Sequence, residues 1–235
     1  MRNDIKAVLF DLDGTLLPMD TSKFMKEYFI LLSKKLSDFG VTPERFLGAT
    51  VKSLHVMAEN LTDRMNSDIF WEFFKAEFGV DESAFPERTS DFYRNEYLSL
   101  KSICGFDPDA GPTVKALKDM GYRLVLATNP LFPRVAITER LKWTGVDIGD
   151  FEFITTYESY HSCKPSPLYY KEIAKNLGLS PSEIMMVGND TNDDMSAEKI
   201  GMKVFLLTKC LINRKELDIS NFPNGEIKDL IEVLS

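Results

Sequence analysis

Two acidic residues follow a short apolar segment near the start of the chain. Asp11 and Asp13 come directly after residues 7–10, and Gly14 follows them. Side chains two residues apart on an extended strand point to the same side, so both carboxylates can face one crevice. Neighbouring carboxylates repel each other unless a cation lies between them or one is protonated. The pattern indicates a metal site, an acid/base pair or both, although Asp and Gly are also common in ordinary turns.

Two later apolar segments also end in polar residues. Thr128 and Asn129 follow the first of them, Asn189 and Asp190 follow the second, and Lys164 lies between the two in sequence. The carboxyl ends of parallel strands meet at one edge of a sheet, where open α/β sheets bind their ligands. We therefore expect these side chains to converge with the first acidic pair at a single site.

The residue types at this site suit phosphoryl transfer. Asp190 and Asp194 are four residues apart at the start of an expected helix, about 6 Å of rise, so both can face one side. Together with Asp11 they make three carboxylates, and hard oxygen ligands of this kind suit Mg²⁺ better than zinc. The Thr128 hydroxyl, the Lys164 ammonium group and the amides of the turn after the first acidic pair can hold phosphate oxygens. Carboxylates with Mg²⁺ opposite an anion-binding cradle describe phosphoryl transfer.

The first acidic pair can divide the chemistry between its two members. Asp11, at the strand end, is the expected nucleophile, which takes the phosphoryl group as an aspartyl phosphate. Asp13, further out, is the expected acid/base, which protonates the leaving oxygen and later takes a proton from the attacking water.

The surrounding chain predicts the elements that position these residues. After residue 107, apolar segments alternate with helical periodicity, which is typical of an α/β fold with a parallel sheet and helices on both faces. Strands are expected at 7–10, 123–127, 151–155, 184–187 and 203–207, and helices at 114–120, 134–143, 167–177, 192–200 and 226–234.

Residues 18–106 carry helical periodicity and no strand pattern, so we expect an all-helical insert there. Its third helix ends at Gly79, and its fourth spans about 90–100. An aromatic cluster on the third helix is expected to form the core of the insert: Phe70, Phe73 and Phe74. The apolar stripes of the first two helices are Phe24, Tyr28, Leu32 and Leu36, and then Leu47, Val51, Leu54 and Ala58. The expected domains are a core of 1–17 with 107–235 and an insert of 18–106.

Composition argues against several classes of protein. The 235 residues carry a net charge of −8, whereas a protein that binds nucleic acid through phosphate contacts normally has a basic surface. The three cysteines, Cys104, Cys163 and Cys210, are too few and too scattered for a disulfide framework or a zinc site. No segment has the pattern of a signal peptide or approaches the length of a membrane span. We expect a cytoplasmic protein with no nucleic-acid or membrane partner, and the oligomeric state stays open.

In the order and context of its motifs, the chain resembles the haloacid dehalogenase superfamily of phosphohydrolases. The family's Asp-x-Asp-x-Thr motif matches residues 11–15, its strand-ending Thr matches Thr128, and its Lys, often followed by Pro, matches Lys164. Its final acidic pair matches Asp190 and Asp194. The resemblance implies a Rossmann-like core, Mg²⁺ as cofactor and a small phosphorylated substrate. Since the insert lies between the first two motifs, it also implies a type-1 helical cap that closes over the site.

The resemblance also assigns a role to each matching residue. Asp11 would be nucleophile and Mg²⁺ ligand, and Asp13 would be acid/base and a ligand through its backbone carbonyl. Thr128, Asn129 and Lys164 would bind the phosphoryl group. Asp190 would ligate Mg²⁺, with Asp194 as a direct or water-mediated partner. Many relatives have Gly-Asp where this chain has Gly188-Asn189-Asp190, so a part for Asn189 or Asp193 in the metal site stays open.

Four other functions compete with that of a phosphatase. A dehalogenase of the same superfamily needs neither Mg²⁺ nor an acid at position 13, so Asp13, Asp190 and Asp194 argue against it. A phosphomutase shares the catalytic residues and stays open as an alternative. The helical insert, and the acids that follow Lys164, count against a signalling receiver domain. The filled catalytic positions give no support to a non-catalytic binding protein.

Overall fold

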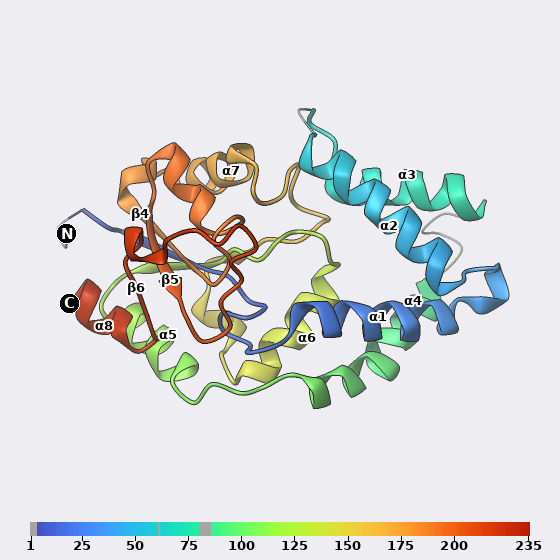
Figure 1. Ribbon diagram of the computed structural model, residues 1–235, viewed down its shortest axis with the longest axis horizontal. Helices are drawn as coiled ribbons and strands as arrows, with labels where there is room; N and C mark the ends of the chain where they lie inside the picture. The colour runs from blue at the N-terminus through green and yellow to red at the C-terminus, as the bar shows by residue number, and fades with distance from the viewer. Residues whose placement is uncertain (1–3, 61, 80–85) are drawn as a thin grey trace.

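A parallel sheet forms the centre of the molecule. The computed structural model describes residues 4–60, 62–79 and 86–235. The sheet has six strands in the order β3-β2-β1-β4-β5-β6, all parallel, with helices on both faces (Figure 1). Its strands are β1 (Ala7–Phe10), β2 (Arg123–Leu126), β3 (Phe153–Ile154), β4 (Ile184–Gly188), β5 (Lys203–Leu207) and β6 (Asn224–Gly225). The predicted α/β class and parallel sheet are confirmed.

Strand β1 lies in the middle of the sheet, and this position explains why its sequence is apolar. It pairs with β2 on one side and with β4 on the other, so that Leu9 lies opposite both Val125 and Met186. All four residues of β1 are fully buried. A strand covered on both faces has no polar side, which is why this segment is continuously apolar.

Side chains of β1 alternate between two separate cores. Val8 and Phe10 belong to one apolar cluster, and Ala7 and Leu9 belong to the other. Helices α5 (Ala110–Asp119), α6 (Arg134–Thr144) and α8 (Asp229–Leu234) contribute to the first cluster. Helix α7 (Pro167–Leu177) and the 3₁₀ helix η6 (Met195–Ile200) contribute to the second. Figure 1 shows α7 on one side of the sheet and α5 and α8 on the other.

The described elements between residues 18 and 106 form a second body of helices, at the right of Figure 1. They are α1 (Thr21–Lys35), η1 (Ser37–Phe39), α2 (Pro43–Ala58), α3 (Asn66–Phe78), α4 (Pro86–Arg94) and the 3₁₀ helix η3 (Glu96–Ile103). The chain enters and leaves this body side by side, because Met19 forms an antiparallel bridge with Cys104. In the part of the chain that the structure describes, none of the helices is both long and apolar enough to cross a membrane.

Two helices of the insert differ from the prediction. The first apolar stripe is buried as predicted, but on α2 the expected stripe is wrong: Leu47 and Val51 are 46% and 56% exposed. The inward face is one residue away and includes Phe46, whose ring contacts Phe29 and Phe74. The fourth helix is also wrong in its bounds, since α4 ends at Arg94 and a 3₁₀ helix follows after a break at Asn95.

Three core elements also differ from the prediction. The helix expected at 192–200 is only a 3₁₀ helix starting at Met195, because Asp190 accepts hydrogen bonds from the amides of Asn192 and Asp193 and holds them in a turn. The strand expected at 151–155 is reduced to β3, which has only two residues. Strand β6 was not expected, because its two residues, Asn224 and Gly225, are typical of turns rather than strands.

Candidate active site

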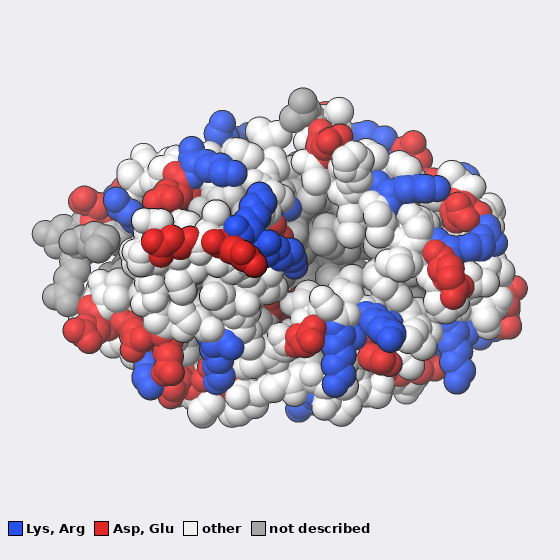
Figure 2. All heavy atoms as spheres, in the orientation of Figure 1, with Lys and Arg blue, Asp and Glu red and all other residues white. Residues whose placement is uncertain are grey.

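The residues predicted to do chemistry lie together at the carboxyl edge of the sheet. One cavity of about 210 Å³ is lined by all seven of the predicted site residues: Asp11, Asp13, Thr128, Asn129, Lys164, Asp190 and Asp194. The insert contributes to the same cavity through α1, including Phe24 and Met25. A hollow in the surface between the core and the insert is visible in Figure 2.

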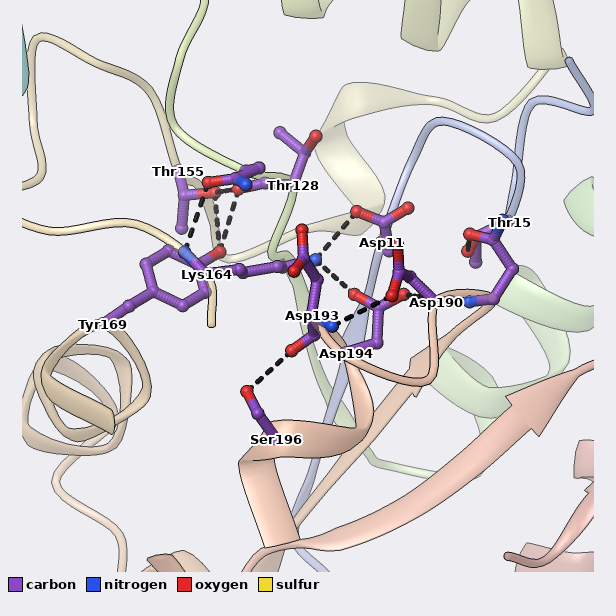
Figure 3. A network of polar contacts seen from close by, with 12 residues as sticks. Asp11, Thr15, Thr128, Thr155, Lys164, Tyr169, Asp190, Asp193, Asp194 and Ser196 are labelled. Atoms are coloured by element: carbon purple, nitrogen blue, oxygen red, sulfur yellow. Dashed lines mark hydrogen bonds and ion pairs between the residues drawn. The ribbon is translucent and has the colours of Figure 1, made fainter. Parts of the chain in front are cut away.

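Lys164 connects two of the carboxylates at the centre of the site. Its ammonium Nζ lies 2.8 Å from Asp11 Oδ1 and 2.6 Å from Asp194 Oδ1, and its side chain is 2% exposed (Figure 3). Burial alone would lower the pKa of Lys164, but the negative charges of Asp11 and Asp194 outweigh that effect and raise it well above the usual value. Lys164 is therefore a permanent cation between two buried acids.

Both carboxylate oxygens of Asp194 accept hydrogen bonds from other groups of the protein. Oδ1 accepts from Lys164, while Oδ2 accepts from the backbone amides of Asn189 and Asp190, each at 2.9 Å. This carboxylate therefore ties the loop after β4 to the lysine. Gly188 makes the arrangement possible, because a Cβ at that position would lie 2.1 Å from Asp194 Oδ2.

That close approach gives a stability prediction for Gly188→Ala. The added methyl group must displace Asp194, so we expect the free energy of unfolding to fall by about 1–3 kcal/mol, with loss of activity. Gly48→Ala is a matched control, since nothing lies within 4 Å of a Cβ there. In helix α2 that control should gain about 0.5–1 kcal/mol. Urea unfolding of both variants checks the pair, and equal stabilities would contradict the proposed close packing.

Asp190 is the carboxylate that follows β4 most closely. Its Oδ1 accepts from the amides of Asn192 (2.8 Å) and Asp193 (3.0 Å), and its Oδ2 pairs with Arg214 Nη1 at 2.8 Å. Arg214 has a side chain that is 65% exposed and comes from the loop after β5. The turn amides therefore fix Asp190 Oδ1, whereas the exposed side chain of Arg214 covers Oδ2.

The neighbouring Asn189 connects three segments of chain. Its Oδ1 accepts from Thr15 Oγ1 at 3.0 Å, and its Nδ2 donates to the Cys210 carbonyl at 2.6 Å. Gly14 lies against this side chain with a φ of +90°, and a Cβ there would be 2.3 Å from Asn189 Nδ2. The amides of Gly14 and Thr15 donate to the backbone carbonyls of Leu17 and Leu12, so these two amides of the turn do not face an anion.

Hydrogen bonds to neighbouring segments of the core fix the positions of Thr128 and Asn129. The Thr128 carbonyl accepts hydrogen bonds from Thr155 Oγ1 (2.6 Å) and from the Tyr169 hydroxyl (2.9 Å), as Figure 3 shows. Asn129 Oδ1 accepts from the backbone amide of Lys164 at 3.2 Å. These contacts fix the strand end of β2 relative to Lys164, so that Thr128 lines the cavity rather than turning away.

Asp13 has a partner that the sequence did not indicate. Its Oδ1 lies 2.9 Å from Nε of Arg140, and the contact is an ion pair because the N–H direction is not aligned for a hydrogen bond. Arg140 comes from α6, is fully buried, and donates from Nη1 to the Tyr97 hydroxyl at 2.6 Å. Its guanidinium group lies 4.3 Å from the centre of the Phe132 ring and 5.5 Å from that of Phe24.

This buried arginine links the acid to the insert. Tyr97 belongs to η3 and Phe24 to α1, both in the insert. Burial would lower the pKa of Arg140, but Asp13 and Tyr97 outweigh it and raise the pKa above its usual value. Sequence reasoning missed Arg140 because an arginine on a helix is usually exposed, and no local spacing pairs it with Asp13.

The cavity carries an excess of negative charge. Its described lining contains two cationic side chains, Lys164 and Arg214, and five carboxylates, Asp11, Asp13, Asp190, Asp193 and Asp194. Burial raises the pKa of Asp11, Asp193 and Asp194. Such a site favours a bound cation, which would offset the cost of keeping these groups ionised.

Oxygen donors at the site fit Mg²⁺ in their chemistry. In the described residues, no group of three or more His, Cys, Asp or Glu side chains is arranged to hold a metal ion by itself. Mg²⁺ does not need such a group, because it keeps several waters and binds proteins through one or two carboxylates. Asp11 and Asp190 are carboxylates of this kind, at the ends of the adjacent strands β1 and β4.

Comparison with known proteins agrees with the geometry. A model of the haloacid dehalogenase-like hydrolase family matches residues 5–201. The chain is 26% identical over 212 residues to phosphoglycolate phosphatase from Vibrio vulnificus (strain YJ016). The matched region covers 88% of this chain and 85% of that protein. The chain is 25% identical over 236 residues to pyrophosphatase PpaX from Bacillus cereus (strain AH820), and this match covers 98% of this chain and 97% of that protein.

A solved structure adds to this comparison. The crystal structure of a HAD phosphatase from Thermococcus onnurineus matches the fold with a TM-score of 0.58 and 27% identity, over 97% of each chain. The family match, the phosphatase relatives and the convergence of all four motifs at one sheet edge lead to one conclusion. The chain belongs to the haloacid dehalogenase-like hydrolase family and is one of its phosphohydrolases.

Proposed function

We propose that the chain is a Mg²⁺-dependent phosphatase that hydrolyses a small phosphorylated metabolite through an aspartyl phosphate on Asp11. The observation that carries the proposal is the position of Lys164 between Asp11 and Asp194, at the cavity that Asp13 and Thr128 also line. A cation beside Asp11 favours the ionised form of its carboxylate and attracts a phosphate group to it.

In the proposed reaction, a carboxylate oxygen of Asp11 attacks phosphorus and the bond to the leaving oxygen breaks. Asp13 gives its proton to that oxygen. Water then attacks the phosphorus of the aspartyl phosphate while Asp13 takes its proton, which releases inorganic phosphate and restores Asp11. Thr128, Asn129 and Lys164 hold the phosphoryl oxygens during both steps.

Mg²⁺, when bound, neutralises charge on the phosphoryl oxygens. Asp11, Asp190 and the Asp13 backbone carbonyl would hold it. We assign Asp194 a supporting part, because its oxygens already bind Lys164 and the amides of the Asp190 loop. For the same reason Asn189, which ties Thr15 to Cys210, is assigned to the loop rather than to the metal.

The insert, residues 18–106, would act as a cap over the site, and the core would comprise 1–17 and 107–235. Arg140 supports this assignment, since it joins Asp13 to Tyr97 and Phe24 of the insert. Asp13 and Asp190 in the cavity favour phosphate chemistry over dehalogenation, which requires neither. A cytoplasmic location remains a prediction from the sequence. Acidic and basic side chains are intermixed on the face in Figure 2, which agrees with a small-molecule substrate rather than nucleic acid.

Metal removal tests the cofactor and the reaction together. With p-nitrophenyl phosphate and Mg²⁺, we expect release of free inorganic phosphate, which EDTA abolishes and excess Mg²⁺ restores. Undiminished turnover in EDTA would overturn the metal assignment. Failure to release phosphate from a broad panel of phosphorylated metabolites would overturn the phosphatase assignment, and an isomerised ester that keeps its phosphate would identify a mutase instead.

A further inference from the structure

A second cavity, larger than the first, lies under the insert. Its volume is about 380 Å³, and it is lined by side chains of α1, α2, α3 and α4, by two loops of the core that follow β2 and β3, and by Val135 of α6. Most of the lining is aromatic or aliphatic, and it includes Tyr28, Phe46, Phe70, Trp71 and Phe74. Ligand pockets are typically of this size and mainly apolar, with a few polar groups.

This apolar cavity adjoins the carboxylate cavity. Met25 of α1, and Leu131 and Phe132 of the loop after β2, line both of them. Leu131 follows Thr128 and Asn129 by only a few residues. A molecule with its phosphate at Asp11 would therefore have its remaining part directed past these three side chains into the apolar cavity.

Three hydroxyl groups of the lining offer little to a bound molecule. Thr50 is 8% exposed, and in the described part of the chain its Oγ1 makes no hydrogen bond. In contrast, the Tyr28 and Tyr93 hydroxyls are 3.0 Å apart and satisfy each other. The Thr50 Oγ1 atom is itself buried out of reach of a water-sized atom, so a molecule in the cavity would meet mainly apolar side chains.

We propose that the substrate is a phosphate monoester of an apolar alcohol, with an alkyl chain or aromatic ring in this cavity. The proposal rests on the phosphatase function proposed above. It distinguishes this chain from relatives named for phosphoglycolate and pyrophosphate. Apart from Arg94 and Glu158, which carry opposite charges, the lining is uncharged, so a charged leaving group would lose hydration over most of this cavity.

A homologous series of substrates tests the proposal. We would measure kcat/KM of the full chain with Mg²⁺ for n-alkyl phosphates from methyl to hexyl, and for phosphoglycolate. Burial of each added CH₂ should raise kcat/KM about three- to fourfold, and phosphoglycolate should be a poorer substrate than the hexyl ester. A flat or falling series, or a preference for phosphoglycolate, would overturn the proposal.

Cavity-filling variants and a matched control locate the effect. Leu54→Trp fills space in the cavity from a partly buried position on α2, and should abolish the gain from methyl to hexyl. Val56→Trp, on the exposed face of the same helix and outside the cavity lining, is the matched control and should keep the gain. Val135→Trp, a half-exposed lining residue on α6, provides a second filling variant if Leu54→Trp fails to fold. An unchanged series in a folded filling variant would contradict the location.

Binding without turnover provides an independent readout. Trp71 lines the cavity, so hexylphosphonate should change the tryptophan emission of the protein, and Trp71→Phe should remove that change. Methylphosphonate should give little change. If short esters are hydrolysed but chain length has no effect on either readout, only the substrate class is wrong; if no ester is hydrolysed, the proposed function itself is wrong.

Discussion

Asp11→Asn should abolish phosphatase turnover while the protein remains folded. The amide has nearly the shape of the carboxylate but cannot attack phosphorus, so kcat should fall by about 1,000-fold or more. Folding should survive, because burial already opposes ionisation of Asp11 and Lys164 keeps Asp194 as its partner. Phosphate release and thermal unfolding, measured on one preparation, check the two halves of the prediction.

The matched control is Asp119→Asn, which makes the same substitution on the exposed surface of α5. Its kcat should equal that of the unmodified protein. If Asp11→Asn retained full activity with the control unchanged, the nucleophile would have to be another group and the proposed mechanism would be wrong.

Lys164→Met should cost both activity and stability. The substitution leaves Asp11 and Asp194 buried without their counter-charge, and breaking a buried pair in this way lowers the free energy of unfolding by about 3–5 kcal/mol. Phosphate binding should also weaken, because the Lys164 ammonium group is proposed to hold the phosphoryl oxygens. Urea unfolding in EDTA and kcat/KM with Mg²⁺ measure the two effects separately.

The stability loss in Lys164→Met should depend on pH. Burial raises the pKa of Asp11 and Asp194 in the folded state, and without the lysine these values rise further. A raised folded-state pKa makes protonation favour the folded form, so the variant should recover stability as the pH falls. The difference from the unmodified protein should be larger at pH 8 than at pH 5. Lys175→Met, at an exposed position on α7, should show no comparable difference at either pH.

Local sequence was enough to predict the central strand and the side chains that meet at its carboxyl end. Residues 7–10 are apolar because both faces of β1 are covered, and that burial leaves a pattern that can be recognised without neighbours. Asp11, Thr128, Lys164 and Asp190 could be expected together, because the carboxyl ends of parallel strands necessarily share one edge.

Contacts between distant segments could not be predicted. Arg140 reaches Asp13 across 127 positions of sequence, and Arg214 reaches Asp190 from a loop with no regular pattern. The position of Asp194 depends on Gly188, whose missing side chain has meaning only once the loop is folded. Such contacts arise from tertiary packing, which periodicity does not encode.

The insert shows the same limit on a larger scale. Its helical character could be predicted. The prediction of which face of α2 points inward was wrong, because Phe46 packs with Phe29 and Phe74 from other helices. The aromatic cluster of α3 was expected as filled core. Phe74 is indeed buried, yet it lines a cavity together with Phe70, so the packing of these helices leaves space that a hydrophobic pattern alone cannot reveal.

Trapping the covalent intermediate tests the central claim most directly. During turnover of a phosphate ester with Mg²⁺, the reaction would be quenched and treated with borohydride, which reduces an aspartyl phosphate to homoserine. Peptide mass spectrometry should then find homoserine at position 11 and unmodified aspartate at position 13. Homoserine at any other aspartate, or unmodified Asp11 in samples quenched throughout active turnover, would contradict the account.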